Sequence, residues 1–229
     1  MLGQSVSINI PIYNNKETIQ EVILECIRIV SSITNDWEIN LVDDGSTDGS
    51  KMIIDKIGKA NERIKIFHHV TNMGFGPTLK EIFTLGSKKW IFFISADGQF
   101  LPSDLIKMWK QTENYDYILG IREKRNDSFF RRVNSKIYNL IISIISKKRT
   151  KDVNSIVLFK RDILSKIQLK SNSAFVHAEL YMKTIKNNFK MTEVKVFHKK
   201  RMHGRGGGGK LNVILKTAHD LVKYILGKI

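Results

Sequence analysis

The strongest constraint on the fold is a regular alternation, over the first 121 residues, of short apolar runs and longer amphipathic segments. The runs have the length and composition of buried strands, and the segments between them repeat their apolar residues at helical spacing. Strands that alternate with helices predict a mostly parallel α/β sheet flanked by helices. The five predicted strands fall within residues 5–13, 37–50, 63–69, 90–95 and 115–121. After residue 121 the pattern changes to basic helices and short strands.

Polar and glycine-rich clusters follow the predicted strands. Any one of them could be a simple turn closed by an Asx-type hydrogen bond. In open parallel sheets, however, ligands bind at the carboxyl ends of the strands, so the coincidence of several clusters there favours a binding site. The clusters are Tyr13-Asn14, Asp43-Asp44-Gly45-Ser46, Gly74-Phe75-Gly76 and Asp97-Gly98-Gln99.

The cluster after the fourth predicted strand has the ligand types of a metal site. A hard divalent cation that bridges the phosphates of a nucleotide takes oxygen ligands, often few of them from protein. Asp97 and the amide oxygen of Gln99 could both face such an ion, and Ser95 offers only a neutral hydroxyl. A type I turn with Asp97 at its start is the structural alternative.

The charge is distributed very unevenly along the chain. Residues 1–121 contain 12 Lys and Arg against 15 Asp and Glu, a net charge of −3, and the remaining residues contain 26 against 7, a net charge of +19. A strongly basic half indicates an anionic partner such as nucleic acid, an anionic membrane surface or phosphate groups. A basic surface that is merely solvated remains the alternative. No nucleic-acid recognition motif accompanies the charge, which disfavours the first partner.

Two basic segments carry apolar stripes at helical spacing. A stripe within residues 137–145 could pack on the core or lie on an anionic bilayer, and the sequence leaves both open. For the stripe within residues 211–225 we expect core packing. The stripes consist of Ile137, Leu140, Ile141, Ile144 and Ile145, and of Leu211, Ile214, Leu215, Ala218, Leu221, Val222 and Ile225.

Cysteine usage and the apolar runs bear on localisation. A single cysteine excludes an internal disulfide, and we expect Cys26 to be a buried thiol. Nothing at the N-terminus resembles a signal peptide, and residues 137–146 are about half of a membrane span. We therefore expect a cytoplasmic protein without a transmembrane helix.

Two further motifs have a structural and a functional interpretation. The stretch GRGGGGK (204–210) has the spacing of a phosphate-binding P-loop, but Leu211 stands where a Ser or Thr would bind magnesium. We expect instead a glycine-rich flap, with Arg201, Arg205 and Lys210 as ligands for phosphate. His68 and His69 show no metal-ligand spacing, and we expect them to be surface residues at a strand end.

The ordered set of motifs resembles one family. The segments SINIPIYNN, EINLVDDGSTDGS, NMGFGPTLKEIFTLG, FFISADGQFLPSDL, GIREKR and KDVNSIVLFKRDIL are similar to those of the family 2 inverting glycosyltransferases of GT-A fold. Within that family they most resemble the dolichol- and polyprenyl-phosphate glycosyltransferases. The resemblance covers roughly residues 5–210. It implies one GT-A domain over residues 1–229, with a nucleotide-sugar half (1–121) and a basic acceptor half (122–229).

The resemblance also implies roles for individual residues. On the donor side, nucleotide binding would fall to Pro11, Tyr13, Glu17, Asp44, Arg201 and Lys210. Asp97 and Gln99 would hold the divalent cation, Mg²⁺ or Mn²⁺. Arg122 and Arg131 would reach phosphate groups and act with Asp97 in catalysis. Ser135 and Asp152 would lie on the acceptor side. Ser95 stands where the family has the first aspartate of its D-x-D motif, which should weaken the metal site.

The implied activity is a metal-dependent transfer of a sugar, with inversion, from a nucleotide diphosphate sugar to a polyprenyl phosphate. The donor would be UDP- or GDP-linked, and the enzyme would lie on the inner face of the membrane. No nucleic acid partner is expected. Two alternatives remain: the same fold acting on a soluble or glycan acceptor, and a sugar-nucleotide binder without turnover.

Overall fold

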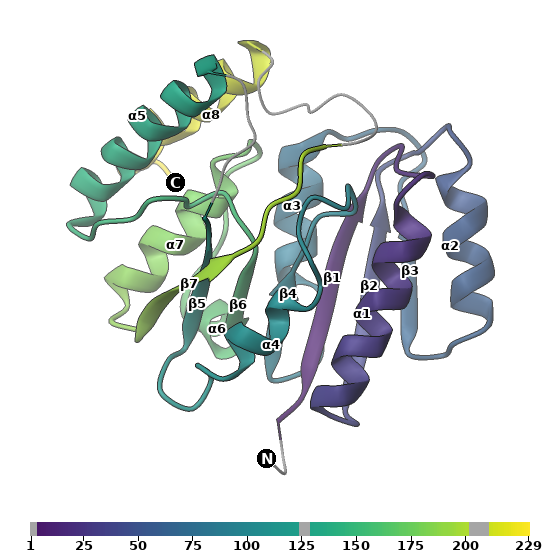
Figure 1. Ribbon diagram of the computed structural model, residues 1–229. Coiled ribbons are helices and arrows are strands. Elements are labelled where there is room, and N and C mark those ends of the chain that lie inside the picture. Colours follow the sequence, from purple (N-terminus) through teal and green to yellow (C-terminus); the bar gives the residue numbers. More distant parts are fainter. Residues whose placement is uncertain (1–3, 124–128, 202–210) are drawn as a thin grey trace.

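The computed structural model describes residues 4–123, 129–201 and 211–229 (Figure 1). The strands are β1 (Val6–Ile12), β2 (Trp37–Asp43), β3 (Ile64–His68), β4 (Trp90–Phe93), β5 (Tyr117–Arg122), β6 (Val157–Lys160) and β7 (Met191–Val196). The helices are α1 (Ile19–Ile33), α2 (Ser50–Lys59), α3 (Phe75–Thr84), α4 (Asp104–Trp109), α5 (Phe129–Ser146), α6 (Asp162–Lys166), α7 (Val176–Lys186) and α8 (Leu211–Ile225).

The strands form one sheet in the order β3-β2-β1-β4-β6-β5-β7. Strands β1, β2, β3 and β4 run parallel to one another, and β5 runs parallel to β7. Among the described strands, β6 alone runs antiparallel to its neighbours, and it joins β4 to β5. The predicted mostly parallel sheet is therefore confirmed, and all five predicted strands belong to it.

Helices cover both faces of the sheet, so the molecule has three layers (Figure 1). Side chains along β1 point alternately to the two faces of the sheet. Ile8 and Ile10 belong to the apolar cluster beneath α1, α2 and α4, whereas Asn9 faces α3 on the other side. The second cluster packs beneath α3, α6 and α7. Asn9 is fully buried, and its amide donates to the carbonyls of Ile82 (2.6 Å) and Leu85 (2.7 Å), at the end of α3.

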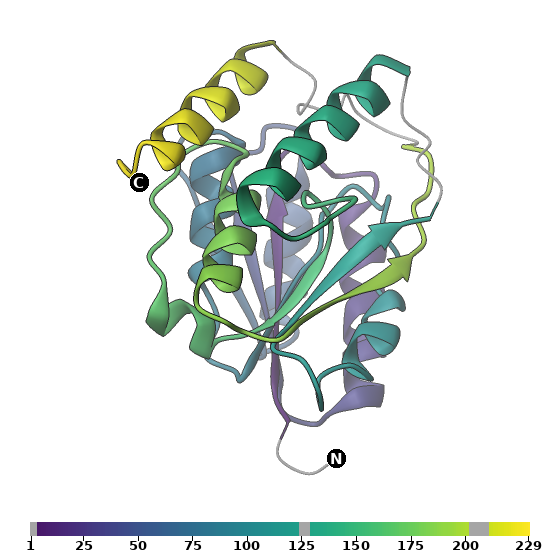
Figure 2. The same ribbon diagram turned by 90° about the vertical axis from the view of Figure 1, so that its left-hand side faces the viewer.

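Helices α5 and α8 lie at the end of the molecule opposite the N-terminus (Figures 1 and 2). Of the α5 residues, Ile142 is buried in the second cluster. Four members of the predicted α5 stripe face solvent, with exposed fractions of 53% for Ile137, 60% for Leu140, 37% for Ile141 and 67% for Ile144.

The expectation of core packing for α8 is wrong, because Leu221 alone among its residues is buried. Its exposed apolar side chains are Leu211, Ile214, Leu215, Val222 and Ile225. An apolar stripe has the same helical spacing whether it packs on the protein core or faces outward. The sequence therefore could not distinguish a core helix from an exposed one. Within the described part of the chain, no helix is long and apolar enough to span a bilayer.

Candidate functional site

The loops that follow β1, β2 and β4 are joined to one another by hydrogen bonds. The backbone N–H of Asn14 donates to Ser46 Oγ (3.0 Å), and its side-chain oxygen accepts from the N–H of Thr47 (2.8 Å). Thr18 donates from its hydroxyl to the carbonyl of Ala96 (2.7 Å). The polar clusters that the sequence placed at strand ends therefore meet at one edge of the sheet.

Asp44 is the central carboxylate of the loops that follow β1, β2 and β4. It is 3% exposed and accepts from the backbone N–H groups of Met73 (2.8 Å) and Gly74 (3.0 Å). Gly74 has a φ of +91°, which favours glycine, and it precedes the first turn of α3. Gly45 also needs to be glycine, since a Cβ there would lie 2.8 Å from the backbone of Asn72. Asp44 thus fixes the entry to α3.

The two histidines lie at the surface at the end of β3, as expected, with His68 exposed and His69 partly exposed, but each ring also contacts carboxylates. His68 lies between Asp43 (3.1 Å) and Asp55 (2.8 Å). His69 lies in the same way against Asp44 (2.8 Å) and is 11% exposed. The sequence did not predict these contacts, because a ring that bridges carboxylates from different elements leaves no pattern in the residue spacing.

The turn after β4 holds Asp97 through three partners. Its Oδ1 accepts from Ser95 Oγ (2.8 Å) and from the backbone N–H of Gln99 (3.1 Å), and its Oδ2 pairs with the Arg201 guanidinium. Gln99 is buried, and its side-chain amide donates to the carbonyl of Lys199 (3.2 Å). The structure therefore brings Asp97, Gln99 and Arg201 together across about a hundred residues of sequence.

The ligand types in this turn suit a divalent cation in part. Asp97 and Gln99 carry a carboxylate and an amide oxygen, which Mg²⁺ and Mn²⁺ both accept. Ser95 donates a hydrogen bond to Asp97 and so adds no second carboxylate. Among the described residues, no three His, Cys, Asp or Glu side chains gather as a metal-binding group. The site fits a cation whose remaining ligands come from substrate phosphates.

On the other side of the sheet edge, Arg122 and Asp152 form a buried ion pair. Arg122 Nε lies 2.6 Å from Asp152 Oδ2, and the two side chains are 7% and 3% exposed. A second contact, between Arg122 Nη2 and Asp152 Oδ1, makes the pair bidentate. The guanidinium carbon also lies 5.9 Å from the centre of the Phe100 ring, just beyond the turn after β4. This pair fixes the Arg122 guanidinium beside the loops that follow β1, β2 and β4.

Asn139 ties α5 to this ion pair. Its amide nitrogen donates to the carbonyl (2.8 Å) and hydroxyl (3.2 Å) of Ser135, and its oxygen accepts from the N–H of Val153 (2.9 Å). Because Val153 follows Asp152 directly, the α5 turn that carries Ser135 is fixed next to the acidic member of the pair. Arg131 lies one turn earlier on α5 and is partly exposed. The residues that the resemblance assigns to the acceptor are thus on adjoining elements.

His177 was not assigned a role from the sequence. It is 3% exposed and packs edge-on against the rings of Phe83 (4.8 Å) and Phe93 (5.0 Å). Burial lowers the pKa of His177 to about 3, and the nearby Arg122 charge acts in the same direction. His177 is therefore a neutral core residue.

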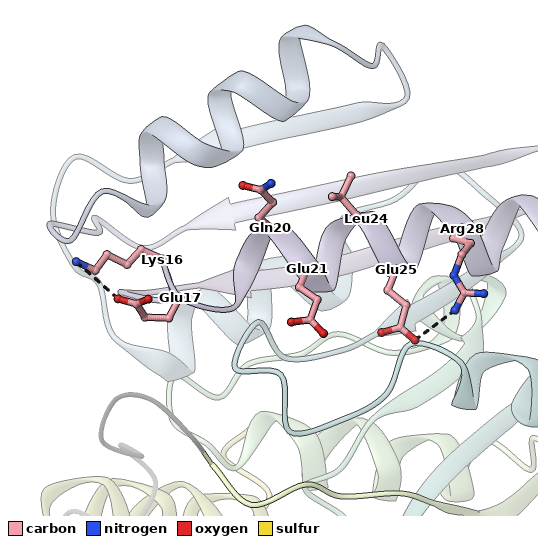
Figure 3. Close-up of a pocket in the computed structure, with 7 residues that line it drawn as sticks. All are labelled: Lys16, Glu17, Gln20, Glu21, Leu24, Glu25 and Arg28. Atoms are coloured by element: carbon pink, nitrogen blue, oxygen red, sulfur yellow. Dashed lines mark ion pairs between the residues drawn. The ribbon is translucent and has the colours of Figure 1, made fainter.

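The remaining assigned residues lie near the end of β1 and the start of α1. Pro11 is partly exposed on β1, and Tyr13 is 49% exposed in the loop beyond it. Glu17 lies in an open hollow of about 720 Å³ along the outer side of α1 and pairs with Lys16 at 3.8 Å (Figure 3). Charged side chains in and just before α1 supply five of the seven residues that line this hollow, and none of the other assigned residues lies there, so the strand-end site is the better candidate. Lys210 and Arg205 lie outside the described residues.

Comparisons with known proteins identify relatives in sequence. The model of "Glycosyl transferase family 2" matches residues 7–168, well over half of the chain. The undecaprenyl-phosphate 4-deoxy-4-formamido-L-arabinose transferase of Salmonella choleraesuis (strain SC-B67) is 29% identical over 207 residues. This match covers 88% of the chain and 62% of the relative, so the chain spans less than two thirds of such relatives.

Solved structures identify the fold. Glucosyl-3-phosphoglycerate synthase from Mycobacterium tuberculosis, crystallised with Mn²⁺, uridine diphosphate and phosphoglyceric acid, matches with a TM-score of 0.74 at 14% identity. The match covers 99% of this chain and 78% of that chain. A complex of the same enzyme with phosphoglyceric acid gives a TM-score of 0.75 at 16% identity. The likeness confirms the predicted α/β fold.

Proposed function

The chain belongs to glycosyl transferase family 2, and we propose that it transfers a sugar from a nucleotide diphosphate sugar to a polyprenyl phosphate. The observation that carries the proposal is the convergence of the Asp44 and Asp97 loops with the Arg122–Asp152 pair at one sheet edge. The names of the undecaprenyl-phosphate transferases among its relatives support the acceptor class.

The donor would lie across the carboxyl ends of β1, β2 and β4. Pro11, Tyr13 and Glu17 would line the nucleotide pocket, and Asp44 would contact the base. Asp97 and Gln99 would hold a divalent cation together with the diphosphate, and the cation would neutralise charge on the departing nucleotide. The presence of Mn²⁺ and uridine diphosphate in the structural relative supports this assignment, with UDP and GDP as the candidate carriers.

The acceptor phosphate would bind between Arg122 on β5 and Arg131 on α5, with Ser135 and Asp152 beside it. A lipid phosphate is already anionic, so no strong base is required of the protein. Its oxygen attacks the anomeric carbon and forms the new C–O bond, while the bond to the nucleotide diphosphate breaks and that group leaves with the electron pair. Positioning and cationic stabilisation of the leaving group would supply the catalysis, with inversion expected from the family.

The exposed faces of α5 and α8 support a membrane-bound acceptor. Both helices carry exposed apolar side chains, and basic residues lie next to them, such as Lys136, Lys147 and Lys216. A helix of this kind lies in the interface of an anionic bilayer with its apolar face inward. We propose that these helices hold the protein on the membrane surface, close to a lipid phosphate.

A soluble acceptor is the second candidate. It is favoured by the structural relative that was crystallised with phosphoglyceric acid, a small phosphorylated acid. A binder of sugar nucleotides without turnover is the third, because Ser95 contributes no second carboxylate at the metal turn.

The test combines binding and transfer. Calorimetry with UDP and GDP, with and without Mn²⁺, should give metal-dependent binding that Asp97→Ala abolishes. Transfer to polyprenyl phosphate should then fail in Arg131→Ala, while Arg132→Ala, a substitution at the next and more exposed position, should keep it. Retained transfer in Arg131→Ala would refute the acceptor assignment, and transfer only to soluble phosphorylated acceptors would favour the second candidate.

A further inference from the structure

Arg201 and Asp97 form an ion pair at the position proposed for the divalent cation. The guanidinium Nη2 contacts Asp97 Oδ2, and the side chains are 24% and 14% exposed. The other carboxylate oxygen, Oδ1, is taken by Ser95 and by the N–H of Gln99. Oδ2 is therefore the oxygen of Asp97 that an incoming cation would approach, and a positive group already occupies it.

Backbone pairing brings Arg201 to this place. The N–H of Lys199 donates to the carbonyl of Gln99 (2.7 Å), and the Gln99 amide donates back to Lys199 (3.2 Å). Next to them, Phe100 and His198 form an antiparallel bridge with their rings 5.0 Å apart. Because both segments are tied by these contacts, the position of Arg201 two residues further on follows from the fold.

The pair leaves part of Arg201 unsatisfied. Its Nε is buried and has no hydrogen-bond partner among the described residues. An unpaired buried N–H of a charged group is unfavourable, so a diphosphate with several acceptor oxygens would be a better partner than one carboxylate oxygen.

We propose that Arg201 and the divalent cation compete for Asp97 Oδ2, and that a nucleotide diphosphate ends the competition by binding both. The cation then takes Asp97, and Arg201 takes phosphate oxygens. Cation and nucleotide would bind cooperatively, because each removes the obstacle to the other. The proposal rests on the proposed donor site, and it gives Ser95 a role, since its hydroxyl fixes the carboxylate that the two cations share.

Arg201→Gln should raise the affinity for Mn²⁺ alone but reduce the gain in that affinity that nucleotide brings. In the absence of nucleotide the variant should bind Mn²⁺ about tenfold more tightly than wild type, because the competing cation is gone. In wild type, UDP or GDP should raise the affinity for Mn²⁺. In the variant this gain in affinity should be several-fold smaller, because the phosphates lose their contact with Arg201. Both constants can be measured by calorimetry or by electron paramagnetic resonance of free Mn²⁺.

Two variants serve as controls. Lys200→Gln removes an equal charge from an exposed neighbouring side chain, and should leave Mn²⁺ binding close to wild type. Arg201→Lys keeps the competing charge, so its affinity for Mn²⁺ alone should also stay near wild type. Should Arg201→Gln fail to fold, Arg201→Ala replaces it with the same expected tightening of Mn²⁺ binding, and non-cooperative binding of Mn²⁺ and nucleotide by wild type refutes the competition.

Other outcomes separate this inference from the proposed function. Equal Mn²⁺ affinity of Arg201→Gln and Lys200→Gln would overturn the competition even if nucleotides bind. Tighter Mn²⁺ binding by Arg201→Gln, lost again in Arg201→Gln combined with Asp97→Ala, would support competition at Asp97. If UDP and GDP then failed to bind, the proposed donor and the nucleotide part of this inference would both fall.

Discussion

His69 and Asp44 are joined by a 2.8 Å contact between the imidazole Nδ1 and the carboxylate Oδ1. The other ring nitrogen lies 2.8 Å from Glu81 Oε2 on α3. A neutral imidazole donates from one nitrogen only, so the imidazolium is the form that donates to both carboxylates. When protonated, His69 places a positive charge between the end of β2 and α3, directly behind the carboxylate proposed to contact the base.

This bridge predicts a loss of stability at alkaline pH. Burial lowers the pKa of His69, but its hydrogen bonds to Asp44 and Glu81 outweigh burial and raise the pKa above its usual value. A histidine whose pKa is raised by folding stabilises the folded state fully at pH values below its unfolded pKa of about 6.5. This contribution is lost as the pH rises through the pKa of the folded state.

The measurement is denaturant unfolding between pH 6 and pH 9. His69→Gln should lower the free energy of unfolding by about 1–3 kcal/mol at pH 6, and by less at pH 9. His219→Gln, at a side chain that is 66% exposed, should follow wild type. A His69→Gln profile parallel to that of wild type would contradict the charged bridge.

Acid should destabilise the protein in part by protonating Glu38. Its carboxylate accepts from Ser7 Oγ (2.7 Å), from the N–H of Ser87 (2.6 Å) and from Lys65 Nζ (2.8 Å). Burial alone would raise the pKa of Glu38, but these hydrogen bonds, that from Lys65 first, lower it to about 2.

The depressed pKa of Glu38 gives a stabilisation of up to about 3 kcal/mol. It is present above the unfolded pKa, near 4.5, and is lost as pH falls toward 2. Unfolding of Glu38→Gln should therefore depend less on pH than unfolding of wild type below pH 4.5. The difference in free energy between the two proteins, measured at pH 7 and pH 3, tests this expectation.

Gly76, the one glycine of α3, should tolerate substitution less well than Gly74, which precedes the helix. A Cβ at this position would lie 2.2 Å from the backbone oxygen of Asn172, which cannot turn away as a side chain can. Gly76→Ala should therefore cost about 1–3 kcal/mol or more of stability. Gly74→Ala meets no atom within 4 Å, so its cost should come from the backbone conformation alone, about 1–3 kcal/mol at a φ of +91°. A thermal unfolding comparison should rank Gly76→Ala as the less stable variant.

Membrane binding should depend on the exposed side chains of α5. Leu140→Glu and Ile144→Glu each replace an apolar group that is at least 60% exposed, so folding should be little affected. Each substitution should weaken sedimentation with anionic vesicles by about tenfold or more, because burial of one such side chain is worth roughly 1.5–3 kcal/mol. Met52→Glu, on α2, is the matched control, since Met52 is 74% exposed. An equal loss in Met52→Glu would argue against a specific membrane face.

The sequence predicted those features that depend on local pattern. The first five strands follow from apolar runs, and Asp44 and Asp97 follow from their place at strand ends. Neither the antiparallel course of β6 nor its place between β4 and β5 could be predicted, because both depend on partners far away in the chain. The same holds for His69 and Arg201, whose partners come from other elements. Their spacing in the sequence carries no sign of these contacts.

The position of β6 has a consequence for the growing chain. Strand β4, with the sequence WIFF, can pair with β1 as soon as it has been made, but its other edge pairs only with β6, between Phe93 and Val157 at one end of the ladder. Until the ribosome has added that strand, an apolar edge with unpaired N–H and C=O groups stays open. Open edges of this kind recruit strands from other chains. Newly made molecules are therefore most prone to aggregate, and most in need of a chaperone, while the segment between β4 and β6 is being synthesised.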